Sequence, residues 1–202
     1  FGLRDELQRT LQVPVAIDTD VNAAALAEQR WGSARGADPC VYITVGTGIG
    51  VGAVIDGRPL HGLVHPELGH LPIEADSEFA GACPVHQNRC VEGVASAPAL
   101  RARLGTAPES MADDHPVWNL EARALARLVS TCVLAYSPRR IVLGGGVLAR
   151  HGLRERVQRE VITMLHGYVP RAELTEDSIA SYLVAPHFGA RSGLMGAFAL
   201  LS

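Results

Sequence analysis

The chain lacks an excess of positive charge and has no apolar run long enough to cross a membrane. Its 202 residues carry a net charge of −3, so no basic surface is available to attract nucleic acid or an anionic membrane. No stretch approaches the roughly 20 apolar residues of a membrane span. We therefore expect no membrane partner, and no nucleic-acid partner unless a helix-turn-helix precedes Phe1.

Cysteine is scarce, and its distribution argues against a disulfide framework. Cys83 and Cys90 lie among histidines, whereas Cys40 and Cys132 stand alone in apolar segments. This pattern indicates one metal site and two buried thiols in a reducing compartment, and we expect the cytoplasm.

Hydrophobic residues make up 48% and charged residues 19% of the chain, which predicts one globular domain with a sizeable core. The sequence opens at Phe1 without an initiator Met, from which we expect a fragment of a longer protein.

Apolar periodicity and glycine or proline breaks place strands between helices, which predicts an α/β fold. The expected helices cover residues 3–11, 22–31, 97–104, 116–136, 153–165 and 192–201, and the expected strands cover residues 15–17, 41–45, 51–55, 141–143 and 182–184.

The segment from His61 to Gly93 has no clear period and needs something other than a core to order it. Cys83, His86 and Cys90 are closely spaced there, with His70 upstream. Two thiolates and two imidazoles suit tetrahedral zinc in a closed structural site. The alternative is a loop with two unpaired thiols and surface histidines, and His65 is a possible substitute ligand.

Two glycine clusters follow expected strands. Gly46-Thr47-Gly48-Ile49-Gly50 could bring backbone N–H groups and the Thr47 hydroxyl close to a phosphate, although a hairpin turn has the same composition. Gly144-Gly145-Gly146 could likewise approach a ligand or form a tight turn. The first cluster lacks the Lys of a P-loop and is followed by a strand, so it has neither the P-loop nor the Rossmann pattern.

Asp20 lies between a strand and a helix, where a carboxylate often caps the helix. In a phosphoryl-transfer enzyme the same carboxylate could orient a hydroxyl nucleophile and accept its proton. Glu67 and Glu92 flank the expected metal ligands, so a zinc ion would hold both where sugar hydroxyls could bind. Without a metal, each is an ordinary solvated glutamate.

The order of these motifs strongly resembles the ROK (repressor, open reading frame, kinase) family, and its bacterial fructokinase branch most closely. The resemblance covers Leu3 to Ser202. It rests on Asp20-x-Asn22, Gly46–Gly50, His65-Pro66-Glu67-Leu68-Gly69-His70, Cys83-Pro84-Val85-His86, Cys90-Val91-Glu92-Gly93, Gly144–Gly146 and the closing Phe188–Ala197.

The resemblance implies an α/β, actin/hexokinase-like (ribonuclease H-like) lobe with an inserted zinc-binding loop at about 61–93. Residues 1–202 would form the C-terminal sugar-binding lobe of a two-lobed kinase, with the N-terminal phosphate-binding lobe absent. The activity implied is phosphorylation of a hexose by ATP with Mg²⁺, from fructose to fructose 6-phosphate, in a homodimer.

Specific roles follow from the same resemblance. It makes Asp20 the general base, and it places Thr19, Asn22, Glu67, His70 and Glu92 at the sugar. It assigns structural zinc to His70, Cys83, His86 and Cys90. The nucleotide would bind Gly46, Thr47 and Gly48 through its phosphates, and Gly144, Gly145 and Gly146 through its adenosine.

The chain departs from the family pattern at three points. Gln87, Asn88 and Arg89 put three residues between His86 and Cys90, where many relatives have two. Thr19 replaces the Asn of glucose-type members, which favours the fructokinase branch. The family's Asp-x-Gly-Gly-Thr phosphate turn is missing.

Two further functions remain open on sequence grounds. The chain could be the sugar-sensing domain of a ROK repressor, or a purely structural zinc domain. The residues before Phe1 would separate kinase from repressor, and the third possibility leaves Asp20 and the glycine turns unexplained.

Overall fold

A five-stranded mixed sheet forms the centre of the molecule. The computed structural model describes residues 2–74 and 78–201. The strand order is β3-β2-β1-β4-β5, in which β2 runs antiparallel to β1 and β3, and β4 runs parallel to β1 and β5. The strands are β1 (Cys40–Val45), β2 (Ile49–Ile55), β3 (Arg58–Pro59), β4 (Arg140–Gly144) and β5 (Leu183–Val184).

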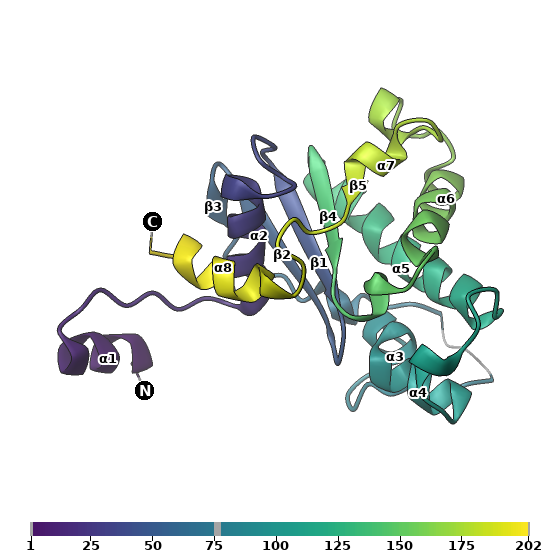
Figure 1. The fold of residues 1–202 in the computed structure, drawn as a ribbon, viewed down its shortest axis with the longest axis horizontal. Helices are drawn as coiled ribbons and strands as arrows, with labels where there is room; N and C mark the ends of the chain where they lie inside the picture. The colour runs from purple at the N-terminus through teal and green to yellow at the C-terminus, as the bar shows by residue number, and fades with distance from the viewer. Residues whose placement is uncertain (1, 75–77, 202) are drawn as a thin grey trace.

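Helices cover both faces of this sheet (Figure 1). On one face α2 packs with α8, and on the other lie α3, α5 and α6. The helices are α1 (Leu3–Leu11), α2 (Asp20–Trp31), α3 (Val91–Ala95), α4 (Ala97–Leu104), α5 (Val117–Tyr136), α6 (Leu153–Leu165), α7 (Ile179–Tyr182) and α8 (Ser192–Ala199).

The side chains of β1 alternate between the two helical layers of the core, because successive side chains of a strand point to opposite faces of the sheet. Val41, Ile43 and Val45 pack with the apolar face of α5, whereas Cys40 and Tyr42 pack with α2. The predicted α/β class is therefore confirmed, and the layers fit the expected actin/hexokinase-like fold. Within the described residues, no helix is both long and apolar enough to span a bilayer.

Two local predictions need correction. The expected strand at residues 15–17 is wrong, since these residues pair with no strand and the side chain of Ile17 is 53% exposed. They belong to an extended connector from α1, a helix that buries none of its residues and lies at one end of the molecule (Figure 1). Tyr182 ends α7 and does not begin the last strand.

Candidate functional site

The start of α2 presents Asp20 to a cavity. The helix is capped by Thr19, whose Oγ1 accepts a hydrogen bond from the Asn22 backbone N–H at 3.2 Å. The cap is therefore Thr19 and not Asp20. The Asp20 carboxylate accepts a hydrogen bond from the adjacent Val21 N–H at 2.9 Å and lines the cavity.

This cavity has a volume of about 450 Å³, and it is lined by Asp20 and by the second glycine cluster, Gly144–Gly146. Its lining joins the start of α2, the ends of β1 and β4, the Gly144–Gly146 turn and residues 185–193. Asp20 and Arg154 are the two charged side chains among its lining residues. A mostly uncharged cavity with a few converging polar groups is typical of a small-molecule site.

Gly145 allows the backbone to close tightly at this edge of the sheet. Its φ of 95° favours glycine, and a Cβ atom there would lie 2.3 Å from the carbonyl oxygen of Val45. The chain after β4 therefore turns directly against the end of β1, beside the cavity.

The first glycine cluster forms the tight connection between β1 and β2 and is held by Glu92. The Ile49 N–H donates to Glu92 Oε2 at 2.9 Å, and the Gly46 N–H donates to the Gly48 carbonyl at 2.9 Å. A Cβ atom on Gly48 would lie 2.9 Å from Glu92 Oε2. Glu92, a predicted sugar ligand, thus contacts the Gly46–Gly50 turn, the predicted phosphate loop.

His70, Cys83, His86 and Cys90 come together in one cluster. Their ligand atoms all lie within 4.8 Å of one another, and Sγ to Nδ1 distances are 3.7 Å for Cys83–His86 and 3.8 Å for Cys83–His70 and Cys90–His70. Zinc–sulfur and zinc–nitrogen bonds at tetrahedral angles give about 3.6 Å between such atoms. These three distances match a tetrahedral zinc site, and the cluster includes His86 in spite of the altered spacing after it.

Two neighbouring residues lie outside this cluster. His65 Nε2 and Glu67 Oε1 are 2.7 Å apart, and both side chains are largely exposed. His65 is therefore paired with Glu67 and does not replace a member of the cluster. Glu92 lies in the first turn of α3, beside His70 of the cluster.

Comparison with known proteins agrees with this arrangement. The family model described as "ROK family" matches residues 1–202. The chain belongs to the ROK family. A fructokinase of Zymomonas mobilis is 44% identical over 192 residues, covering 93% of this chain and 62% of that protein. A Bacillus subtilis protein is 40% identical over 196 residues, covering 96% and 65%.

Solved ROK structures share the fold. The crystal structure of a ROK hexokinase from Thermus thermophilus superposes with a TM-score of 0.81 at 30% identity, covering all of this chain and 69% of that one. The ROK chain described here spans less than two-thirds of the length of the Zymomonas and Bacillus relatives.

The ROK motif at the start of α2 contains a polar network that sequence patterns did not reveal. Asp18 accepts hydrogen bonds from the Thr19 N–H at 2.7 Å and from the Asn22 Nδ2 at 2.8 Å, and it lies 3.0 Å from His61 Nε2. Burial alone would raise the pKa of Asp18, but the bonds from Asn22, His61 and Thr19 outweigh it and lower the pKa. Asn22 is fully buried, and its Oδ1 has no hydrogen-bond partner among the described residues.

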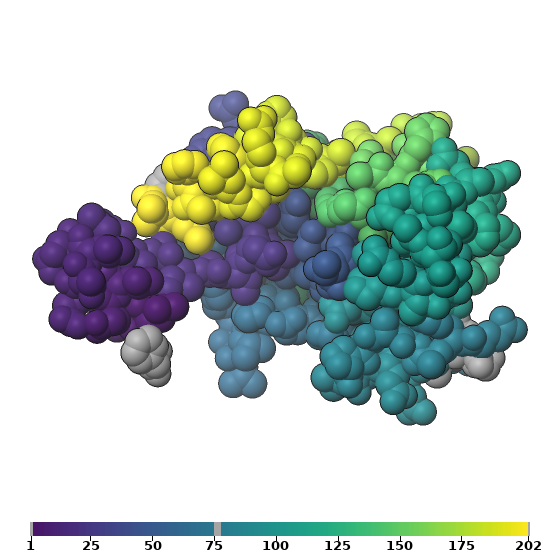
Figure 2. All heavy atoms as spheres, turned by 60° about the horizontal axis from the view of Figure 1, so that its bottom comes forward, coloured from purple at the N-terminus to yellow at the C-terminus, as the bar shows by residue number. Residues whose placement is uncertain are grey.

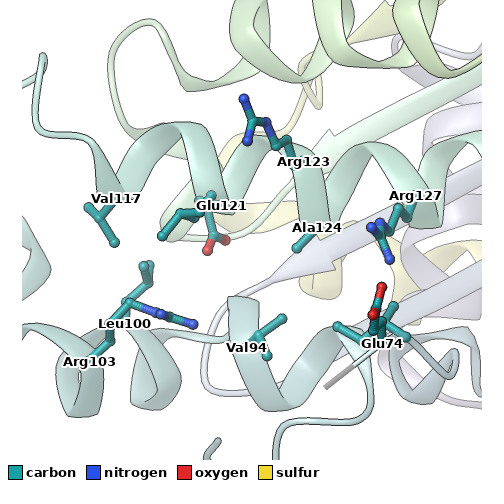
Figure 3. A pocket seen from close by; sticks show the side chains of 11 residues that line it. Glu74, Val94, Leu100, Arg103, Val117, Glu121, Arg123, Ala124 and Arg127 are labelled. Atoms are coloured by element: carbon teal, nitrogen blue, oxygen red, sulfur yellow. The ribbon is translucent and has the colours of Figure 1, made fainter. Parts of the chain in front are cut away.

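A second, smaller cavity of about 180 Å³ lies between α4 and α5 of the ROK chain (Figure 3). Glu121 lies at its inner side, and neither carboxylate oxygen has a hydrogen-bond partner in the described part of the chain. Burial raises the pKa of Glu121 well above its usual value, with Arg103 opposing the shift. Among the described residues, none lines both this cavity and the Asp20 cavity.

Proposed function

We propose that this ROK chain is the sugar-binding lobe of an ATP-dependent hexose kinase that converts fructose to fructose 6-phosphate. The observation that carries the proposal is the presence of Asp20 and the Gly144–Gly146 turn in one cavity of about 450 Å³. A kinase needs a base beside the sugar hydroxyl and a backbone surface for the nucleotide within reach of each other.

In the proposed reaction the sugar hydroxyl oxygen forms a bond to the γ-phosphorus, and the bond from that phosphorus to the leaving ADP oxygen breaks. Asp20 orients the hydroxyl and accepts its proton. Mg²⁺ would accompany ATP and neutralise charge on its phosphates. A Streptomyces griseus ROK glucokinase, 24% identical to this chain, was crystallised with glucose and AMPPNP, which supports the binding of a hexose together with a nucleotide here.

The nucleotide is proposed to bind between the two glycine turns. Gly144, Gly145 and Gly146 would contact the adenosine, while Gly46, Thr47 and Gly48 would approach the phosphates through backbone N–H groups. The contact between Ile49 and Glu92 supports this proposal, because it holds the phosphate turn next to a sugar ligand.

The sugar is proposed to contact Thr19, Glu67, His70 and Glu92. Asn22 is fully buried, so its contribution would be to hold Asp18 and the first turn of α2 beside the sugar. The fructokinase names of relatives at 31–44% identity support fructose as the substrate.

Zinc is proposed to bind His70, Cys83, His86 and Cys90 as a structural ion. Its chemistry would be to order the loop at about 61–93 and to hold His70 and Glu92 in place. The three sulfur–nitrogen distances of 3.7 to 3.8 Å, with all four ligand atoms within 4.8 Å of one another, support this assignment.

The proposal extends to the rest of the protein. We infer that a phosphate-binding lobe precedes Phe1, that the kinase is a homodimer, and that it acts in the cytoplasm, where the free thiols Cys40 and Cys132 would stay reduced. A helix-turn-helix before Phe1 would instead support the repressor function.

The test is a coupled assay of the full-length protein with Mg-ATP and separate hexoses. We expect ADP formation with fructose at a higher kcat/KM than with glucose or mannose. Absence of turnover with every hexose, together with specific DNA binding, would replace the kinase by the repressor.

A further inference from the structure

Glu28 is a fully buried carboxylate in the second half of α2 that receives four hydrogen bonds. Its Oε2 accepts from the backbone N–H of Ser33 at 2.8 Å and of His187 at 3.1 Å. Its Oε1 accepts from the Phe188 N–H at 3.2 Å and the Ser192 hydroxyl at 3.4 Å. The Ser192 hydroxyl has one hydrogen and also bonds the Gly189 carbonyl at 2.9 Å. The three backbone N–H donors are therefore the main compensation for the loss of water around the carboxylate.

Three of these donors come from the segment that forms one wall of the Asp20 cavity. His187 and Phe188 lie in the turn after β5, and Ser192 begins α8, while Ala185, Gly189 and Ser192 line the cavity. A carboxylate at the start of a helix is also favoured by the helix dipole. Glu28 thus ties the cavity wall to α2, the helix whose first residue is Asp20.

Gly32 lies directly against the Glu28 carboxylate. A Cβ atom on Gly32 would lie 2.1 Å from Glu28 Oε2. Gly196 similarly lets α8 approach α2, because a Cβ atom there would lie 2.6 Å from the Ala23 backbone carbon. The position of the wall therefore depends on close contact between α2 and the segment after β5.

We propose that Glu28 is a positioning residue for the nucleotide. It touches no ligand, because its side chain is fully buried, and it acts by fixing the 185–192 wall at a set distance from Asp20. The inference rests on the proposed kinase function, since it takes the cavity to be the nucleotide site. It predicts selective loss of nucleotide affinity when the carboxylate is altered.

The experiment measures AMPPNP and fructose dissociation constants and kcat in the full-length protein, for wild type and Glu28→Gln. In either orientation the amide nitrogen of Gln would face at least one backbone N–H donor, so the wall should shift. We expect the AMPPNP dissociation constant to rise about tenfold or more, the size expected for one lost hydrogen bond to a charged group, and fructose affinity to change less than about twofold. Glu176→Gln, an exposed change outside the cavity lining, is the matched control.

Gly32→Ala provides a second test. It leaves the Glu28 carboxylate in place, but the new methyl group would push against Glu28 Oε2. It should reproduce the selective loss of nucleotide affinity even if Glu28→Gln folds poorly. Unchanged AMPPNP affinity in a folded variant, or equal losses for AMPPNP and fructose, would overturn the inference. If wild type itself binds no AMPPNP, the proposed function fails, and the role proposed for Glu28 fails with it.

Discussion

The Nε2 atom of His70 lies 3.9 Å from the Oε1 atom of Glu92. The Nδ1 atom of the same ring faces the sulfur atoms of Cys83 and Cys90. The imidazole of His70 can therefore bind the proposed zinc through Nδ1, while Nε2 faces Glu92, a proposed sugar ligand. Carboxylates commonly accept a hydrogen bond from the second nitrogen of a metal-bound histidine.

The first prediction concerns zinc. Purified protein should contain about one zinc per chain, and Cys83→Ser should lower this content and destabilise the loop, because a tetrahedral site loses one of four ligands. Elemental analysis and thermal unfolding measure both effects. Cys132→Ser is the control, since that buried thiol lies in the α5 core outside the cluster. A metal-free protein with a well-folded loop would rule the site out.

The second prediction concerns Glu121. Its raised pKa means that the folded protein keeps a proton that the unfolded chain loses above the ordinary value of 4.5. Stability should therefore fall as pH rises, by up to about 1.4 kcal/mol per pH unit, until the folded pKa is passed. Glu121→Gln should remove this loss, and its advantage over wild type should grow as the pH rises above 4.5 until the folded pKa is passed. Parallel stability profiles for the two proteins in urea unfolding would contradict the assignment, and exposed Glu155→Gln serves as control.

The third prediction concerns Arg154. It lies in the first turn of α6, where the helix dipole disfavours a cation. It lines the Asp20 cavity, and its Nε is buried and has no hydrogen-bond partner in residues 2–74 and 78–201. Arg154→Leu should weaken nucleotide binding about tenfold or more, as expected for a lost charge-assisted hydrogen bond, with fructose affinity retained. Arg159→Leu, on the exposed side of the same helix, should change neither. Equal nucleotide affinity in Arg154→Leu and wild type would exclude the contact.

The fourth prediction concerns the surface of α8 (Figure 2). Leu194, Phe198 and Leu201 are 59%, 59% and 63% exposed, and adjacent exposed apolar side chains promote association. We expect the 202-residue chain alone to self-associate and to show no kinase activity. Leu194→Ser with Phe198→Ser should shift light-scattering masses towards the monomer. A monodisperse monomeric wild-type chain, or turnover of fructose by these 202 residues alone, would contradict this account.

Local patterns predicted much of the fold and site. The run from Val41 to Ile55 encodes a strand, a glycine turn and a second strand, and the structure has β1 and β2 there. The spacing of Cys83, His86 and Cys90 was sufficient to predict the cluster, because metal ligands are restricted to a few residue types. Such features depend on residues close in sequence.

Contacts between distant segments could not be predicted in this way. Glu28 meets residues 187–192, and Asp18 meets His61, through the packing of α2 against other elements. Glu28 lies in an Ala-rich helix, and no pattern in the neighbouring sequence indicates that its side chain is buried. The apolar run at residues 15–17 gave a wrong prediction because a short run does not distinguish a buried strand from an extended connector.

The central claim is that Asp20 is the base of a sugar kinase, and Asp20→Asn tests it most directly. This change keeps the size and the hydrogen-bonding capacity of the side chain but removes its charge and basicity. In the full-length protein, kcat for fructose phosphorylation by Mg-ATP should fall by about a hundredfold or more, while the fructose dissociation constant changes little. An unchanged kcat in Asp20→Asn would show that Asp20 is not the base.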